Sequence, residues 1–238
     1  MGSVYALTLR QLSGKWRLTI TTVLAAMPVL IAALMLRSSN APSVWDFERA
    51  VLGAMLAGAI APLVVLAIGA AAFSNEIEDR TLANLTLSPI PRWQIVLPKL
   101  LAAITIAGPF IAASAFATSW IAFLGDIRAV TAVTVSLLVG VALYSSAFVY
   151  LGLVTTQAIG IGLLYIVLWE GFFSQFVAGV RLLSIRHYAI SLMYGLDPRR
   201  FEPLDDQLGL WVAIGLCLLV FGGFLLLSVR RLRRMDVP

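Results

Sequence analysis

Few residues of this sequence have the types and spacing that chemistry requires. Glu170 stands alone in the apolar stretch YIVLWEGFF, and an acidic run lies at 76–79. The single histidine, His187, and the single cysteine, Cys217, are distant in sequence, so a metal cage is not expected. No GxxxxGK[ST] phosphate loop, GxSxG elbow or HExxH zinc motif occurs. We therefore do not expect the chain to be an enzyme by itself or to hydrolyse ATP in the usual way.

Composition places the chain in a membrane. Of its 238 residues, 61% are hydrophobic and 12% are charged, with a mean hydropathy of +0.96. These values exclude an ordinary soluble domain and predict an all-α polytopic membrane protein. The basic residues lie at the ends of apolar runs, so membrane lipids are expected partners and nucleic acid is not. The lone cysteine excludes an intrachain disulfide.

Six apolar runs are long enough to cross a bilayer as helices. They cover residues 18–36, 50–73, 100–124, 129–153, 158–177 and 208–229. Residues 1–17 carry an apolar stripe at helical spacing, which predicts a helix lying in the membrane interface. A cleaved signal peptide is the alternative for the first run, but the run is long for one. Residues 178–207 mix apolar and basic residues, which favours short re-entrant or interfacial helices.

Basic residues near the two ends of the chain predict its orientation. Arg10, Lys15 and Arg17 precede the first apolar run, and four arginines follow the last one within 230–234. The positive-inside rule places both groups in the cytoplasm, and we expect the plasma membrane, which is the inner membrane where a cell has two. Six spans satisfy this arrangement. The segment 74–99 then faces the cytoplasm.

The segment 74–99 is the longest charged interruption in the first three quarters of the chain. Its acidic start suits a helix N-terminus, and Leu82 and Leu85 share one face of that helix. Pro89 ends the helical turn, and Pro91 begins a second short helix. One interpretation is a rigid helical surface presented to a partner in the aqueous phase. The other is a capped, solvated connector.

Glu170 also has two interpretations once the chain is taken as a membrane protein. A carboxyl group within a span is costly unless it faces the bundle interior or a water-filled path. Glu170, with Tyr165 and Trp169, therefore lines either a translocation path or a subunit interface in the functional interpretation. In the structural interpretation, Glu170 bonds a neighbouring helix and Trp169 anchors the span near the membrane surface.

The charged segment carries a recognisable motif. Its residues are Glu76, Glu78, Arg80, Thr81, Leu82, Leu85, Pro89, Ile90, Arg92, Ile95 and Lys99. This pattern resembles the cytoplasmic segment of ABC-2 type transporter permeases, which commonly carry E-x-x-x-G-T-L, a leucine pair, P-[VI]-x-R and a lysine that opens the third span. Arg80 departs from the pattern, because glycine is common there. The six spans and cytoplasmic termini agree with the same family.

The resemblance implies a transmembrane subunit that works as a dimer with two separate ATPase subunits. ATP and magnesium would be bound by those partners, so no cofactor is expected in this chain. The segment would include the coupling helix: Glu76, Glu78, Arg80, Thr81, Leu82 and Leu85 would form or frame the ATPase contact, and Pro89 and Arg92 would set the return to the membrane. The partner permease would be either identical or related.

The expected activity is export of a hydrophobic or amphipathic compound or lipid, which the apolar spans favour. Two other classes stay open. A stand-alone secondary transporter or channel needs ionisable groups at mid-membrane, and Glu170 is the main candidate. A membrane-embedded enzyme or assembly factor is disfavoured because the usual site constellations are missing.

Overall fold

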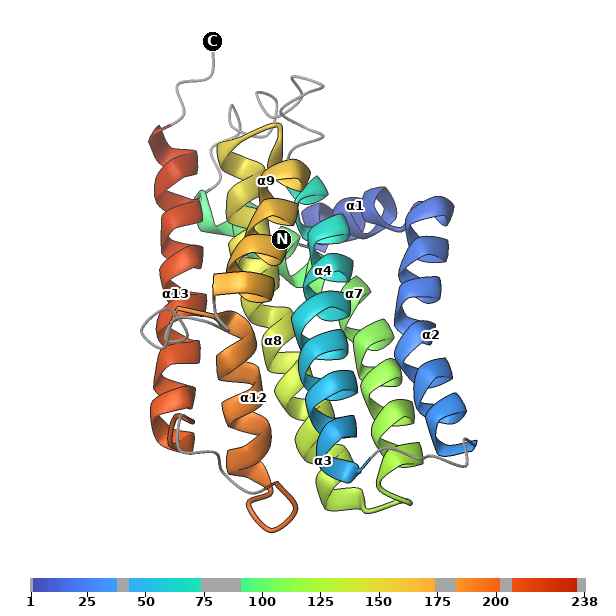
Figure 1. Cartoon of the computed structure of the whole chain (residues 1–238). Coiled ribbons are helices and arrows are strands. Elements are labelled where there is room, and N and C mark those ends of the chain that lie inside the picture. Colours follow the sequence, from blue (N-terminus) through green and yellow to red (C-terminus); the bar gives the residue numbers. More distant parts are fainter. Residues whose placement is uncertain (1, 38–42, 74–90, 174–182, 202–206, 235–238) are drawn as a thin grey trace.

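The computed structural model describes residues 2–37, 43–73, 91–173, 183–201 and 207–234. Within these ranges the secondary structure is helical, as predicted, and Figure 1 shows an upright bundle with one short helix lying across its end. The helices are α1 (Gly2–Leu12), α2 (Lys15–Arg37), α3 (Val44–Phe47), η1 (Glu48–Ile60), α4 (Ala61–Gly69), α7 (Trp93–Ala122), α8 (Ile127–Val154), α9 (Ala158–Leu164), η2 (Tyr165–Phe173), α12 (Ile185–Leu196) and α13 (Leu210–Arg234). The two η elements are π-helices.

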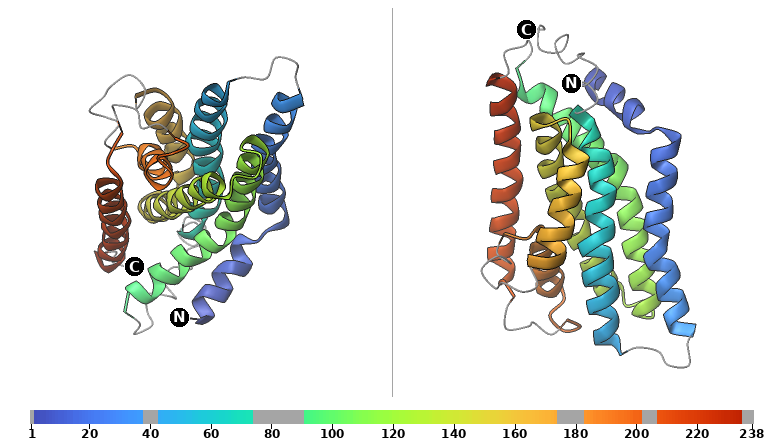
Figure 2. Two further views of the ribbon diagram at one scale, coloured as in Figure 1. Left: turned by 90° about the horizontal axis from the view of Figure 1, so that it is seen from below. Right: turned by 45° about the horizontal axis from the view of Figure 1, so that its top comes forward.

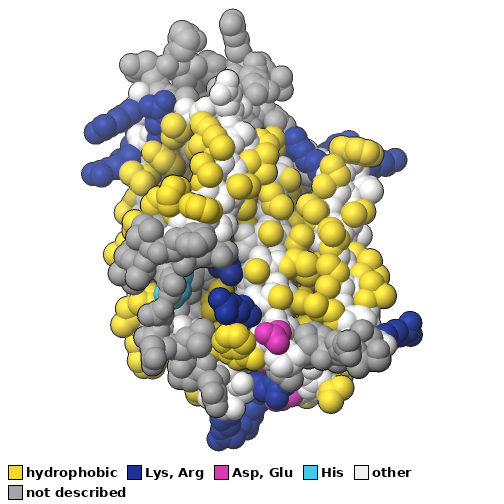
Figure 3. Space-filling view, in the orientation of Figure 1, with side chains coloured by type: hydrophobic (Ala, Val, Ile, Leu, Met, Phe, Trp, Pro, Cys, Tyr) yellow, Lys and Arg dark blue, Asp and Glu magenta, His cyan; other side chains and the backbone are white. Residues whose placement is uncertain are grey.

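Five stretches of the described residues are long and apolar enough to cross a membrane. They are Lys15–Met35, Trp45–Phe73, Trp93–Ala122, Ile127–Val154 and Leu210–Arg234. Figure 3 shows hydrophobic side chains over much of one face of the bundle, with most basic side chains near its two ends. This distribution is that of a polytopic membrane protein, as the composition predicts.

The N-terminal helix, the start of α7 and the end of α13 lie at one end of the bundle, which we call the terminal end (Figures 1 and 2). Helix α1 lies crosswise there and packs against α7, and the Tyr5 hydroxyl donates a hydrogen bond of 3.0 Å to Thr105 Oγ1. An interfacial helix was expected over residues 1–17. The structure instead ends α1 at Leu12 and starts α2 at Lys15.

The third predicted span and the short helix predicted from Pro91 form one helix, α7. It has 30 residues and contains Pro98 and Pro109, and at 1.5 Å per residue it is roughly 45 Å long. Proline removes a backbone donor, but membrane helices tolerate it where neighbouring helices satisfy the freed groups. In the left panel of Figure 2 the first turns of α7 extend sideways from the bundle, alongside α1.

The predicted fifth span, 158–177, is described as far as residue 173 and is helical over Ala158–Phe173. Figure 1 shows α9 and η2 descending from the terminal end to about mid-height, and α12 continuing toward the opposite end. Helix α12 packs against α8 and α13, and half of its residues are buried, including Ile185 and Tyr188. The described parts of the predicted fifth span and of the predicted outer segment therefore lie in series along the bundle.

Candidate functional site

Most residues predicted to contact the ATPase lie outside the described residues. These are Glu76, Glu78, Arg80, Thr81, Leu82, Leu85 and Pro89, and their roles stay predictions. Arg92 is described and directly precedes α7, where its carbonyl oxygen accepts hydrogen bonds from the amides of Ile95 at 3.1 Å and Val96 at 3.2 Å. Arg92 therefore begins the helix that carries the chain back into the bundle.

Lys99 is the charged residue that joins the two helices flanking the predicted coupling residues. Its side chain is fully buried, and its Nζ donates a hydrogen bond of 2.6 Å to the carbonyl oxygen of Ala72. The same Nζ lies 4.4 Å from the centroid of the Phe73 ring. A cation is favoured over an aromatic face, and a buried ammonium group needs an acceptor such as a backbone carbonyl oxygen. Ala72 and Phe73 immediately precede the charged segment. Lys99 therefore connects the place where the chain leaves the second span to the helix by which it returns to the bundle.

Glu170 lies at the break between η2 and α12. Its side chain is fully buried. One carboxylate oxygen, Oε1, accepts hydrogen bonds from the Tyr165 hydroxyl at 2.9 Å and from the Ile185 amide at 3.0 Å. The other, Oε2, accepts from the Ser184 hydroxyl at 2.5 Å. Three donors from two helices therefore meet on one carboxylate.

These contacts make Glu170 a cap for the N-terminus of α12. Ser184 is the N-cap residue, and its Oγ accepts from the His187 amide at 3.1 Å. The free amides of a first helical turn and the helix dipole both favour negative charge at this position. The carboxylate therefore satisfies donors that would otherwise be buried without partners. The structural interpretation of Glu170 has these contacts in its support, and the translocation-path interpretation stays a prediction.

The other predicted residues near Glu170 divide between two surroundings. Tyr165 belongs to the hydrogen-bonded cluster, whereas the ring of Trp169 packs 6.3 Å from that of Phe173, centroid to centroid. Ser184 and Arg186 were not predicted as site residues. Ser184 donates to the Glu170 carboxylate, and Arg186 Nη1 donates a hydrogen bond of 3.4 Å to the Glu170 carbonyl oxygen. The available signal was a basic residue inside the short apolar run after 183, since such residues in a membrane protein mark functional or paired sites.

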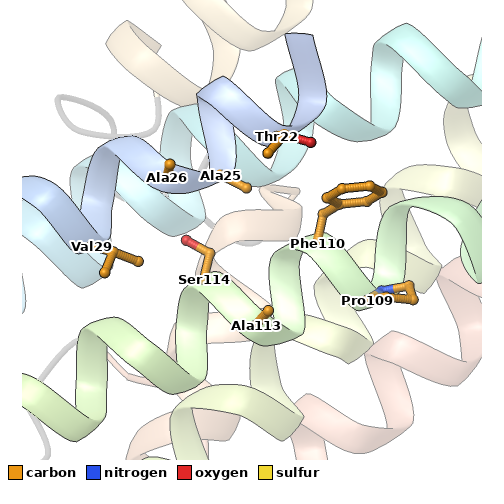
Figure 4. Close-up of a pocket in the computed structure, with 8 residues that line it drawn as sticks. All are labelled: Thr22, Ala25, Ala26, Val29, Pro109, Phe110, Ala113 and Ser114. Atoms are coloured by element: carbon orange, nitrogen blue, oxygen red, sulfur yellow. The ribbon is translucent and has the colours of Figure 1, made fainter. Parts of the chain in front are cut away.

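A separate apolar hollow lies between α2 and α7. It has a volume of about 410 Å³ and is lined by Thr22, Ala25, Ala26, Val29, Pro109, Phe110, Ala113 and Ser114 (Figure 4). The Ser114 hydroxyl is buried without a hydrogen-bond partner in the described part of the chain. The lining offers van der Waals contacts and two hydroxyl groups but no charge.

Metal and thiol chemistry find no support in the described ranges. No group of three or more His, Cys, Asp or Glu side chains there is arranged to hold a metal ion. Cys217 is buried on α13 among apolar side chains, which makes its thiol a poor nucleophile. The described contacts of Lys99 and Glu170 are hydrogen bonds that connect helices.

Comparison with known proteins agrees with the motif and the helical bundle. A family model described as ABC-2 family transporter protein matches residues 9–189. No curated protein matches the chain. The matched region runs from the last residues of α1 to the first turn of α12 and includes both Lys99 and Glu170. The chain is a multi-pass membrane protein, and it belongs to the ABC-2 transporter family, whose members are the membrane components of ABC transporters and work with ABC ATPase subunits.

Proposed function

We propose that this chain is the permease subunit of an ATP-driven exporter for a hydrophobic or amphipathic compound or lipid. Two ATPase subunits bind the terminal end, which faces the cytoplasm, and the segment 74–99 is their main contact. ATP and magnesium are bound by those subunits. A second permease, identical or related, completes the transport path.

The Lys99–Ala72 hydrogen bond is the observation that carries this proposal furthest. A coupling segment transmits force only if its two ends move with the helices that they join. Lys99 holds the start of α7 against the end of the second span, at the two points where the segment leaves and re-enters the bundle. A rigid displacement of the segment is therefore passed to both helices together.

The charges at the terminal end support its cytoplasmic placement. Arg230, Arg231, Arg233 and Arg234 lie in the last turns of α13 and are not buried. Helix α1, which lies crosswise at the same end, carries Arg10 in its last turn. Arginine and lysine are enriched on the cytoplasmic side of membrane proteins. These two basic groups therefore agree on one orientation.

The test of the ATPase contact is a pair of leucine substitutions. The chain is co-expressed with its ATPase, and Leu82→Arg plus Leu85→Arg is compared with the unmodified chain by affinity purification and ATP hydrolysis. Leu124→Arg is the matched control, because Leu124 is 91% exposed in the turn between α7 and α8, at the opposite end of the bundle. The proposal expects the double variant to lose the ATPase and the control to retain it. Retention by the double variant would refute the contact.

A further inference from the structure

Arg186 occupies an unusual position for a cation. It is the second residue of α12, which begins at about mid-height of the bundle, where η2 ends (Figure 1). Ionisable groups at this depth are expensive and are retained where they pair with a charge or serve a function. Breaks between short helices at mid-membrane are also where transporters place substrate-binding groups.

Two glycines on η1 make room for the Arg186 guanidinium group. A Cβ atom added at Gly58 would lie 3.2 Å from Cδ, Nε and Nη1 of Arg186, which is tighter than ordinary contact. A Cβ at Gly53 would lie 3.9 Å from Nη2. The guanidinium group therefore lies along the glycine face of η1. Both η1 and η2 are π-helices, a rare form that occurs frequently at functional sites.

The Glu170 carboxylate attracts Arg186, and the hydrogen bond between these two residues runs from the guanidinium group to the Glu170 backbone carbonyl oxygen. The carboxylate oxygens accept from Tyr165, Ser184 and the Ile185 amide, which are neutral donors. Arg186 donates one hydrogen bond, to the Glu170 carbonyl oxygen at 3.4 Å, and forms no ion pair with another described residue. Its side chain is half-buried. Donor groups of a guanidinium that can make five hydrogen bonds are therefore left for a ligand.

A second cation lies close to the first. Arg49 stands four residues before Gly53 on η1, and a Cβ atom at Gly53 would lie 3.9 Å from Arg186 Nη2. Its guanidinium carbon lies 5.4 Å from the centroid of the Trp45 ring, and the side chain is exposed. Figure 3 shows basic side chains beside hydrophobic ones and an acidic one below mid-height of this face. Two neighbouring cations repel each other, and an anion between them removes that repulsion.

We propose that Arg186 and Arg49 form a binding site for an anionic group, a phosphate or a carboxylate, in the half of the bundle away from the terminal end. This inference rests on the proposed export function and narrows the substrate class to anionic amphiphiles. Guanidinium groups bind phosphate and carboxylate oxygens through paired, charge-assisted hydrogen bonds. Exposed apolar side chains on η2, Val167, Leu168 and Phe172, offer contacts for an acyl chain.

The test measures binding to the purified full chain with its ATPase, in a neutral detergent and without nucleotide. The probes are a lysophosphatidic acid, the monoacylglycerol of the same chain length, which lacks the phosphate, and inorganic phosphate. Isothermal titration calorimetry gives the affinity of each probe. The variants are Arg186→Gln, Arg186→Lys and Arg49→Gln. Arg128→Gln is the control, because Arg128 is exposed in the first turn of α8.

The proposal expects lysophosphatidic acid to bind at least about tenfold more tightly than the monoacylglycerol, and each glutamine variant to weaken it by about tenfold. Arg186→Lys should retain part of the affinity, and Arg128→Gln should retain all of it. Competition by inorganic phosphate would identify a free anion as sufficient. Absence of competition would identify a lipid headgroup, whose chain adds the remaining affinity. Both results support the site.

Equal binding of the two lipids, or unchanged affinity in Arg49→Gln and Arg186→Gln, would overturn the proposal. If Arg186→Gln fails to fold, the affinity of Arg49→Gln for lysophosphatidic acid decides the question, because Arg49 is exposed. Co-purification of the ATPase is recorded for every variant. A variant that loses anion binding but retains the ATPase is changed at this site alone. An unmodified chain that never binds an ATPase contradicts the proposed function instead.

Discussion

The Nζ atom of Lys99 donates a 2.6 Å hydrogen bond to the carbonyl oxygen of Ala72, with both residues fully buried. This hydrogen bond connects α7 directly to the end of the second span, although the two residues are 27 positions apart in the sequence. The Phe73 ring, 4.4 Å from Nζ, provides a second favourable contact for the charge. The base of the predicted coupling segment is therefore a fixed joint of the fold.

Replacing Lys99 with methionine should weaken this joint. Methionine is unbranched and of similar length, so the packing of the stem is largely kept while the donor is removed. The Ala72 carbonyl oxygen then loses its partner in a buried setting, which costs about 1–3 kcal/mol. We expect a lower unfolding temperature for Lys99→Met in detergent, and weaker stimulation of the bound ATPase by substrate.

Lys15→Met is the matched control, because Lys15 is exposed at the start of α2. It should unfold close to the unmodified chain. If Lys99→Met were as stable as the control and equally stimulated, the contact with Ala72 would have no part in coupling.

Substitutions at Glu170 separate hydrogen bonding from charge. Glutamine keeps an acceptor oxygen for Tyr165 and the Ile185 amide, and the Ser184 hydroxyl can accept from its amide group. We therefore expect Glu170→Gln to fold. Glu170→Leu removes the acceptor of two buried donors and of the partly buried Tyr165 hydroxyl, and should lose about 3 kcal/mol or more. Thermal unfolding of the two variants, side by side, measures this difference.

Transport by the same variants tests whether the charge of Glu170 has a role beyond capping α12. If ionisation matters, Glu170→Gln alters transport more than Glu170→Asp, which keeps the charge. Equal transport by these two and the unmodified chain would leave Glu170 as a packing residue. Full stability in Glu170→Leu would be inconsistent with the capping role itself.

Gly152 tests the close packing of α8 against the second span. A Cβ atom added there would collide with the backbone carbonyl oxygen of Ala70. Backbone atoms cannot rotate away as a side chain does, so the two helices must separate. We expect Gly152→Ala to lose about 2 kcal/mol or more, within the range known for overpacking. Unfolding temperature and the yield of folded chain in detergent are the readouts.

Gly215→Ala is the control for Gly152, because a Cβ at Gly215 would meet no atom within 4 Å. Alanine also has the higher helix propensity, so this variant should be neutral or slightly more stable. Comparable stability of the two alanine variants would show that α8 and the second span do not need the close approach.

Hydropathy predicts the long helices well, because each membrane-spanning helix needs a continuous run of apolar residues. The predicted spans 18–36 and 129–153 agree with Lys15–Arg37 and Ile127–Val154 within a few residues. The fifth run differs in one respect. Composition treats 158–177 as one apolar run, but its helix changes from the α form to the π form at Tyr165. Hydropathy does not distinguish these two forms.

The contacts of the candidate sites depend on residues that are distant in sequence. Lys99 meets a carbonyl group 27 positions away, and Glu170 meets donors 14 and 15 positions ahead of it across the break. No periodicity within one helix encodes such pairs. The sequence identifies charged residues in an apolar setting as unusual, and tertiary packing decides whether each one caps a helix, joins two helices or faces a ligand.

The central claim is that this chain works with an ATPase bound at its terminal end, and the most direct measurement is purification of the chain from its native membrane without added partners. The account predicts that an ABC ATPase co-purifies in a fixed, equal ratio to the permease and hydrolyses ATP. It also predicts that Leu82→Arg plus Leu85→Arg abolishes this association. A chain that purifies without any ATPase and drives transport from an ion gradient alone would contradict the account.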